Sequence, residues 1–278
     1  MKTSKKQAVE TLQSIGTLPL KSFGQNFITD KKIIHKIIAS CQISCTDHIL
    51  EIGPGIGTLT QYFLKKGARV TAVEKDKKLF QYLTEFFLDD EHLNLIQGNI
   101  LKIPFEKPYF QSTSYKIISN LPYNISSQVL LKIIMHSELF EEVFLGLQKE
   151  VAMRISSKEG SKVYGLLSPF VQLEYKAKVL FSIPAQSFHP APRVTSAFLR
   201  LKRFSLFSIQ EKHRYFQFLK LCFSHRRKKL LNNLKKSYPE IVIGNLFEDL
   251  HINRNFRAEN ISPDLFHKMF KILEPDMS

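Results

Sequence analysis

Two amides, a proline and a tyrosine follow directly after a predicted strand in the segment NLPYN, which begins at Asn120. An adenine or cytosine amine is a poor nucleophile because its lone pair is delocalised into the ring. The Asn120 side-chain oxygen and the main-chain carbonyl of Leu121 can together accept both N–H groups and aim that lone pair at a methyl group. Pro122 restricts Leu121 to extended geometry, and Tyr123 offers a ring on which a flipped base can stack. The alternative interpretation is a strand-ending turn with a buried tyrosine.

A glycine-rich loop follows an earlier predicted strand in LEIGPGIGTLT. Gly53, Gly55 and Gly57 allow the backbone to bend tightly and to approach a ligand closely. Glu74, at the end of the next strand, can accept hydrogen bonds from both ribose hydroxyls of an adenosine-containing cofactor. The third glycine comes one residue too early for the dinucleotide pattern G-x-G-x-x-G, and Glu51 precedes the loop. The pattern E-x-G-x-G-x-G therefore favours S-adenosylmethionine over NAD as the cofactor.

Strand and helix periods alternate from residue 48 onward, and this alternation places both motifs at strand ends. The expected strands are 48–52, 68–74, 93–97, 115–119, 141–148, 175–182 and 195–202, and the expected helices are 58–66, 77–88 and 126–136. The last two strands follow each other without a long helix, so we expect them to add an antiparallel edge to a parallel core. The fold class is therefore α/β and Rossmann-like, and ligands should bind at the carboxyl ends of the strands.

The last third of the chain is helical in period and strongly basic. We expect one long helix over 211–236 and shorter helices near Ile241 and Pro263. Twelve basic residues against two acidic ones lie between Arg200 and Glu240, and the 278-residue chain has a formal net charge of +15. Such an excess favours a nucleic-acid partner, although a solubilising surface is the alternative. The expected domains are 1–205, a methyltransferase domain, and 206–278, a small all-α RNA-binding domain.

Hydropathy and cysteine usage indicate the cellular compartment in which the protein is expected. No apolar run approaches the roughly 20 residues that a membrane span needs, and no hydrophobic stretch follows the lysine-bearing start. The three cysteines, Cys41, Cys45 and Cys222, form no C-x-x-C pair and leave an odd count. This usage is typical of a reducing compartment. We expect a cytoplasmic protein without a metal site.

The motifs and their order resemble those of the S-adenosylmethionine-dependent ribosomal RNA adenine dimethyltransferases, in particular the small-subunit (KsgA) type. The similarity extends over nearly the whole chain. It is carried by KSFGQNFITD at 21, LEIGPGIGTLT at 50, VEKD at 73, NLPYNISS at 120, LQKEVAMRI at 147, SKVYGLLS at 161, FHPAPRVTSAFLRL at 188 and CFSHRRKKLLNNL at 222. The resemblance implies dimethylation of two adjacent adenosines in a loop near the 3′ end of 16S rRNA during ribosome biogenesis. It also implies a monomer that acts on an immature small ribosomal subunit.

The resemblance assigns several cofactor contacts. Asn26 and Ile28 match positions that line the methionine end of the cofactor, Gly53 matches a glycine-loop contact, and Glu74 matches the ribose contact. The chain departs from the family after the third strand, where QGNI offers Asn99 in place of the usual aspartate that accepts from the cofactor's adenine amine. An asparagine oxygen can still accept this bond while its NH₂ group donates to a ring nitrogen.

The resemblance also assigns catalytic and RNA-binding residues. Asn120 matches the catalytic asparagine, and Tyr123 and Phe188 match aromatic residues that sandwich the target adenine. The usual K-V-D-S reads R-V-T-S here, so Arg193 and Thr195 make the surrounding cleft more basic than in the family pattern.

The basic run after Cys222 poses a separate question. Arg226 and Arg227 fall on or beside the apolar stripe of the expected long helix. Either they pair with an acid across the domain junction, or they face the cleft and bind phosphate, and a guanidinium group suits both tasks. The neighbouring Lys228 and Lys229 favour the phosphate-binding interpretation.

Three other functions stay open on the sequence alone. A large-subunit rRNA adenine methyltransferase of the resistance type shares the cofactor and NLPY-like motifs, but the segments FSHRRKKLLNNL and FHPAPR favour the small subunit. A non-catalytic ribosome-assembly or transcription factor would keep the fold without the chemistry, and the intact Asn120, Pro122 and Tyr123 argue against it. The third alternative is that the chain is a dehydrogenase, in which case it would bind a nicotinamide cofactor.

Overall fold

The chain forms two compact units in the structure, a computed structural model that describes residues 5–19, 24–110 and 112–275. The first unit comprises Met1–Ala152 and Lys178–Lys202, and the second unit comprises Met153–Ala177 and Arg203–Ser278.

The division differs from the single boundary expected near residue 205. The chain passes into the second unit for the second time after Lys202, which is close to the expected boundary. However, the stretch Met153–Ala177 also belongs to the second unit. The reason is packing: α7 (Leu167–Gln172) contacts α8 (Ile209–Cys222) and α11 (Pro263–Leu273). Such contacts depend on tertiary structure, so local sequence patterns do not reveal them.

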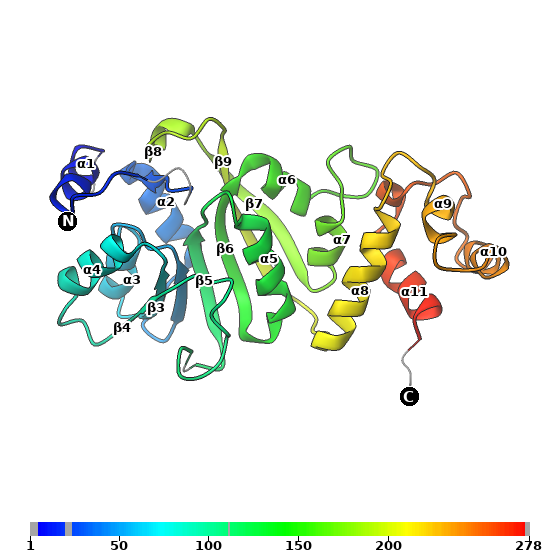
Figure 1. Cartoon of the computed structure of the whole chain (residues 1–278), viewed down its shortest axis with the longest axis horizontal. Helices are drawn as coiled ribbons and strands as arrows, with labels where there is room; N and C mark the ends of the chain where they lie inside the picture. Colours follow the sequence, from blue (N-terminus) through cyan, green and yellow to red (C-terminus); the bar gives the residue numbers. More distant parts are fainter. Residues whose placement is uncertain (1–4, 20–23, 111, 276–278) are drawn as a thin grey trace. The chain divides into compact units, whose positions relative to one another are not determined.

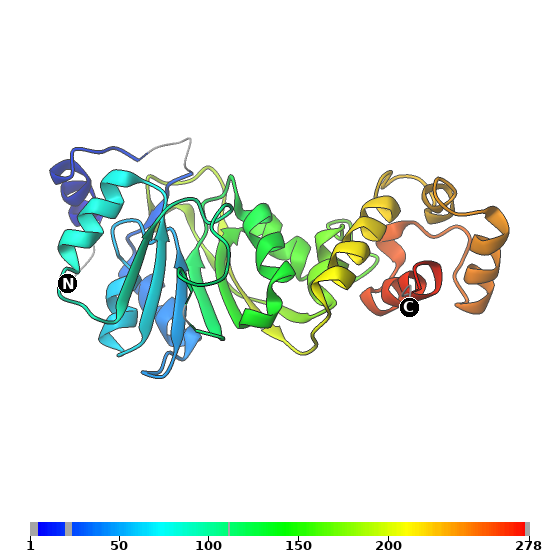
Figure 2. The same ribbon diagram turned by 60° about the horizontal axis from the view of Figure 1, so that its bottom comes forward.

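The first unit is organised around a seven-stranded sheet of order β4-β3-β2-β5-β6-β9-β7 (Figure 1). Its strands are β2 (His48–Ile52), β3 (Arg69–Glu74), β4 (Leu93–Gln97), β5 (Tyr115–Asn120), β6 (Phe140–Gln148), β7 (Tyr175–Ile183) and β9 (Ser196–Arg203). The strands from β4 to β6 pair in parallel, and β9 pairs antiparallel with β6. The predicted α/β fold is thereby confirmed. The order reverses between β2 and β5, which lie side by side in Figure 2.

The helices of the first unit were only partly predictable. The helices α3 (Thr60–Lys65), α4 (Lys77–Phe86) and α5 (Ser126–Met135) lie where periodicity places them. The unpredicted elements are α1 (Lys5–Ser14), α2 (Lys31–Cys41), the 3₁₀ turns η2 (Ser137–Leu139) and η3 (Ala185–Ser187), and the two-residue strands β1 (Phe27–Ile28) and β8 (Phe188–His189). The strands β1 and β8 pair antiparallel and are too short to leave a periodic signal. The helix α6 (Lys149–Ile155) follows β6 directly.

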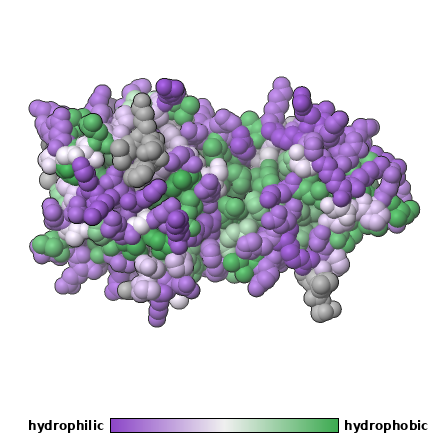
Figure 3. All heavy atoms as spheres, viewed as in Figure 1, coloured by the Kyte–Doolittle hydropathy of each residue, from purple (hydrophilic) through white to green (hydrophobic). Residues whose placement is uncertain are grey.

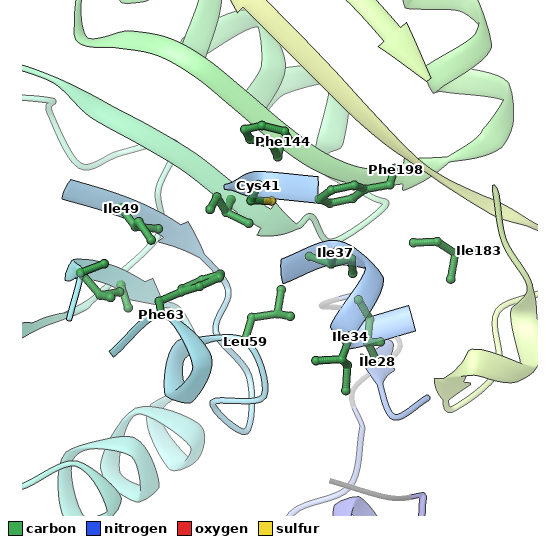
Figure 4. Packing of buried hydrophobic residues seen from close by; sticks show 14 of the residues in the cluster. Ile28, Ile34, Ile37, Cys41, Ile49, Leu59, Phe63, Phe144, Ile183 and Phe198 are labelled. Atoms are coloured by element: carbon green, nitrogen blue, oxygen red, sulfur yellow. The ribbon is translucent and has the colours of Figure 1, made fainter. Parts of the chain in front are cut away.

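The main core of the first unit lies between α2, α3 and one face of the sheet. Ile34, Ile37 and Cys41 of α2 are buried at helical spacing and belong to the same apolar cluster as Phe144 and Phe198 of β6 and β9 (Figure 4). The N-terminus of α2 is capped by Asp30, whose carboxylate accepts from the backbone N–H groups of residues 32 and 33. The core therefore anchors the segment that leads from β1 into α2.

The second unit is mainly helical, but the long helix expected over 211–236 is wrong. Its elements are α7, α8, α9 (Leu230–Leu234), α10 (Glu240–Asp249), the 3₁₀ turn η4 (Ala258–Asn260) and α11. The helices near Ile241 and Pro263 are confirmed as α10 and α11. None of the helices formed by residues 5–19, 24–110 and 112–275 is long and apolar enough to span a membrane.

A side chain of α9 stabilises the break between α8 and α9. The buried side chain of Asn233 donates to the carbonyl of Cys222 at 2.7 Å and to that of His225 at 3.3 Å, which satisfies groups left open where α8 ends. In a continuous helix, Arg226 and Lys229 would also be three residues apart and would repel each other. The result is an exposed basic loop, residues 224–229, between the two helices.

Candidate active site

A pocket lies at the carboxyl ends of the strands around the reversal point. Side chains that line it come from the ends of four parallel strands, namely Glu51 from β2, Glu74 from β3, Asn99 after β4 and Asn120 from β5. The empty volume of the pocket, including the part open to solvent, is about 1010 Å³. The position is the one expected for ligands of such sheets.

The glycine loop forms one wall of the pocket. Gly53 and Gly55 have φ values of +70° and +63°, which side chains rarely adopt, and both residues line the pocket. A Cβ atom on Gly55 would lie 2.8 Å from the Phe27 ring. The loop therefore needs glycine for its backbone conformation, as the motif predicted, and Gly55 also for the close approach of β1, which was not predicted.

Glu74 presents a buried carboxylate to the same wall. Its side chain is 5% exposed, and its two oxygens accept from the backbone N–H of Asp76 at 2.8 Å and of Gly55 at 3.1 Å. Burial raises the pKa of Glu74 to about 7, although these backbone hydrogen bonds oppose the shift. Each oxygen keeps a second lone pair for hydroxyl donors.

Glu51 is the second buried carboxyl of the pocket. It is 2% exposed, and its Oε2 accepts from the Thr60 hydroxyl at 2.6 Å. Burial raises the pKa of Glu51 to about 8, the Thr60 hydrogen bond lowers it, and the nearby charge of Glu74 raises it further. The side chain of Glu51 is thus fixed by Thr60 at the start of α3.

Replacing Glu51 by glutamine should change how stability depends on pH. Because the folded-state pKa of Glu51 lies above its ordinary value, the folded protein binds more protons than the unfolded chain between about pH 4.5 and pH 8, and stability falls as pH rises through this window. Each pKa unit corresponds to about 1.4 kcal/mol. In thermal unfolding, we expect the Tm of Glu51→Gln to decrease by less between pH 5 and pH 8.5 than the Tm of the wild type. The exposed Glu85→Gln is the matched control, and equal pH dependence in all three proteins would contradict the proposed cause.

The segment around β1 forms the opposite wall. Asn26 and Ile28 line the pocket, as the resemblance predicted, and Ile28 also packs in the core. The Asn26 carbonyl accepts from Asn120 Nδ2 at 3.1 Å, and its side-chain Nδ2 donates to the Gly24 carbonyl at 3.1 Å. These bonds tie the wall to the end of β5.

Asn99 lies at the pocket beyond the end of β4. Its Oδ1 accepts from the backbone N–H of Leu101 at 3.1 Å, which forms a local turn. The oxygen retains one lone pair, and the NH₂ group remains the donor of this side chain. The structure thus allows the double role expected for an asparagine at this position.

Asn120 carries the most informative polar atom of the site. Its Nδ2 is bonded to the Asn26 carbonyl, whereas its buried Oδ1 has no hydrogen-bond partner. Among the described residues of the first unit, the only other buried side-chain oxygen without a partner is Thr58 Oγ1, and both residues line the pocket. Buried acceptors without partners are costly, so both atoms indicate ligand positions.

The rest of the NLPY motif surrounds this amide. The backbone N–H of Leu121 donates to the Gly146 carbonyl at 3.1 Å, and Pro122 lines the pocket. The half-buried Tyr123 is fixed through a hydrogen bond between its hydroxyl and that of Ser196. The interpretation of NLPY as a purely structural turn is therefore incomplete, because two of its residues face the pocket.

Phe188 and Arg193 differ in exposure. Phe188 is 1% exposed and belongs to the same apolar core as Ile28, so its ring is covered by core residues in this structure. The pairing of β8 with β1 turns its side chain inward. Arg193 is exposed and does not line the pocket.

Several pocket residues were missed by sequence reasoning, and Thr58 and Asn124 are two of the polar ones. Thr58 directly follows the glycine loop, and its position after GPGIG was the available signal. Asn124 ends the NLPYN segment and also lines the pocket, so the second amide of that motif belongs to the site.

The predicted RNA-binding residues of the second unit fall into two kinds. Arg226 donates to the carbonyls of Lys162 and Tyr164 and to the Glu259 carboxylate at 2.8–3.3 Å, so its guanidinium group holds parts of the unit together. Arg227 and Lys228 are exposed in the basic loop, and Lys229 donates to Asn255. Figure 3 shows hydrophilic residues over much of the visible face of this unit. The described residues contain no group of three or more side chains that could hold a metal ion.

The fold and the pocket together define a class of protein, the S-adenosylmethionine-dependent methyltransferases with a Rossmann-like sheet. The pocket residues fit this cofactor, since it offers ribose hydroxyls for Glu74 and polar groups for the unpaired oxygens. The model of the family described as "Ribosomal RNA adenine dimethylase" matches residues 19–275, and the chain belongs to this family. It is thus a methyltransferase that uses S-adenosylmethionine.

Individual relatives agree with this assignment. The chain is 36% identical over 262 residues to a protein of Ureaplasma urealyticum named ribosomal RNA small subunit methyltransferase A, covering 92% of both chains. A protein of the same name from Lactococcus lactis is 38% identical, with 92% of this chain and 90% of that one covered.

Two solved structures resemble the fold. A dimethyladenosine transferase from Plasmodium falciparum has a TM-score of 0.74 and 25% identity, covering 88% of this chain and 96% of that one. The 23S rRNA methyltransferase ErmE has a TM-score of 0.69 and 21% identity, covering 90% of this chain and all of that one, which supports the fold alone.

Proposed function

We propose that this chain dimethylates the exocyclic amines of two adjacent adenosines in small-subunit rRNA, in a loop near the 3′ end. The names and high coverage of the bacterial relatives support the small subunit as the substrate. The observation that carries the chemistry is the buried Oδ1 of Asn120, which has no hydrogen-bond partner among the described residues and belongs to a residue that lines the pocket. Incubation with labelled S-adenosylmethionine and unmethylated small subunits, followed by mapping of the labelled adenosines, tests the proposal. Label elsewhere, or none, would contradict it.

Asn120 and Leu121 orient the target amine. When bound, the cofactor supplies an electrophilic methyl group on sulfur. Asn120 Oδ1 accepts one N–H of the adenine amine, and the Leu121 carbonyl accepts the other, which favours a pyramidal nitrogen with its lone pair directed at the methyl carbon. As the new N–C bond forms, the S–C bond would break and leave a neutral thioether. The methylated nitrogen is then strongly acidic, so water can take its proton. The reaction therefore needs orientation rather than a strong base.

Tyr123 provides the surface on which the flipped base stacks. The hydrogen bond to Ser196 on β9 fixes the ring from its hydroxyl end. Because Phe188 is buried in the core, a base held from both sides would require that side chain to move, and we assign the stacking to Tyr123 alone.

Glu74, Gly53 and the segment from Asn26 to Ile28 hold the cofactor. The Glu74 carboxylate accepts from the ribose hydroxyls, the glycine loop allows close approach, and Ile28 lines the methionine end. Asn99 faces the adenine ring, with its NH₂ group as the available donor.

The basic loop of the second unit binds RNA phosphates. The exposed positions of Arg227 and Lys228 suit this role, whereas Arg226 positions the loop through Glu259 and two carbonyls. Arg193 adds a further exposed cation on the first unit. Loops and helix ends of RNA present unstacked bases, so the target is a splayed loop of the immature subunit.

Removal of the two exposed cations should weaken RNA binding in a salt-dependent way. We expect the double variant Arg227→Ala/Lys228→Ala to lower the slope of log Kd against log salt by about 1.4 to 1.8, since each phosphate contact contributes roughly 0.7–0.9. Filter binding at several salt concentrations measures this slope. Arg226→Ala should instead lower Tm, because its contacts are internal. An unchanged slope in the double variant would remove the loop from the interface.

The setting of this activity follows from its substrate. We infer that the protein acts as a monomer in the cytoplasm, where small subunits assemble. The three cysteines are free, which is consistent with a reducing compartment.

A further inference from the structure

Gly146 lies near the carboxyl end of β6, a strand with neighbours on both sides. Glycine weakens a strand interior because it adds backbone entropy to the unfolded chain and no side chain to the core. Gly146 is not among the glycines with positive φ, so its backbone does not require glycine. Gly146 therefore destabilises a central strand, and its backbone conformation does not explain why glycine is present.

The space around Gly146 gives a different reason. A Cβ atom at this position would lie 2.5 Å from Asn120 Oδ1 and 3.3 Å from Asn120 Cγ and Cα, and these are the three nearest atoms. The two residues are direct partners in the pairing of β5 with β6. Asn120 cannot simply rotate away, because its Nδ2 is bonded to the Asn26 carbonyl.

Gly146 also holds the residue that carries the second acceptor group. Its carbonyl accepts from the backbone N–H of Leu121 at 3.1 Å, which fixes one side of that residue's backbone. The same residue thus leaves room for the Asn120 amide and holds the strand end that carries the Leu121 carbonyl. No other residue is nearer to the space that a side chain here would fill.

We propose that Gly146 is a positioning residue for methyl transfer, because the absence of its side chain lets Asn120 direct its amide oxygen at the substrate amine. The inference rests on the proposed role of Asn120. It assigns to this chain a steric requirement on β6, outside the NLPY motif and outside the lining of the pocket.

The first test is Gly146→Ala. We expect kcat for methylation of small subunits to fall about tenfold or more, since a displacement of about 1 Å at a reacting group costs rates of this order. The Kd of S-adenosylmethionine, measured by calorimetry, should stay within about twofold. Gly244→Ala is the matched control, because the nearest atom to its added Cβ is 3.9 Å away. Wild-type kcat in Gly146→Ala would overturn the proposal.

A second test does not depend on activity. Gly146→Ala should lower Tm in the wild-type background, and the loss should be clearly smaller in the Asn120→Ala background, where the crowded amide is absent. Equal losses in the two backgrounds would overturn the proposal, because they would assign the effect to other contacts of β6. A failure of the proposed function can be distinguished from a failure of this inference, because it would appear as full activity of Asn120→Ala itself.

Discussion

Asn120→Ala should abolish detectable methylation of small subunits while cofactor binding changes by only a few fold. Removal of a single preorganised hydrogen-bonding group at a reacting centre typically costs about 100- to 1000-fold in kcat. Here the lost group is the Oδ1 acceptor that has no partner within the folded chain. The Nδ2 bond to the Asn26 carbonyl is lost as well, so a modest effect on the cofactor wall is expected.

Single-turnover methylation and calorimetric cofactor titration separate these two effects. Asn245→Ala removes an exposed amide of α10 and serves as the control. If Asn120→Ala retains the wild-type single-turnover rate, the amide does not orient the amine. If it loses cofactor binding as severely as activity, its role is structural.

Glu74→Gln should raise the Kd of S-adenosylmethionine by about 100-fold. Hydrogen bonds to a charged partner contribute about 1.5–3 kcal/mol each, and two ribose hydroxyls are expected to donate to this carboxylate. The glutamine NH₂ group would also face the N–H of Asp76 or Gly55, which are donors themselves. The variant therefore loses an acceptor and gains a repulsive contact.

The pH dependence of binding identifies the same group. Because burial raises the pKa of Glu74 to about 7, the free protein holds a proton there below pH 7, and that proton must leave when the hydroxyls donate to the carboxylate. Affinity should thus fall as pH decreases below 7, by up to about tenfold per unit. Glu74→Gln should lose most of this slope, whereas the exposed Glu85→Gln should retain it. A pH-independent affinity in the wild type would exclude Glu74 as the ribose acceptor.

The motifs that were predictable from sequence are those whose function depends on neighbours in the chain. The glycine loop, Glu74 and NLPYN each end a strand of a recognisable βαβ pattern, and strand ends of a parallel sheet meet at one edge. Local spacing is therefore sufficient to place Glu51, Gly53 and Asn120 in one pocket.

The parts that were not predictable depend on contacts distant in sequence. Phe188 is turned inward by the pairing of β8 with β1, and the long basic helix is broken where Asn233 satisfies the end of α8. Arg226 forms an ion pair with Glu259, an acid within its own unit. The two partners considered from the sequence were an acid across the domain junction and an RNA phosphate. In each case the deciding partner is too distant in the chain for periodicity to identify it.

The orientation of the target amine is the central claim, and a structure of the protein with a non-reactive cofactor analogue and an adenosine-containing RNA loop tests it most directly. We predict that the adenine amine nitrogen lies about 3 Å from both Asn120 Oδ1 and the Leu121 carbonyl oxygen, with the methyl position opposite. An amine nitrogen more than about 4 Å from Asn120 Oδ1 would contradict this claim.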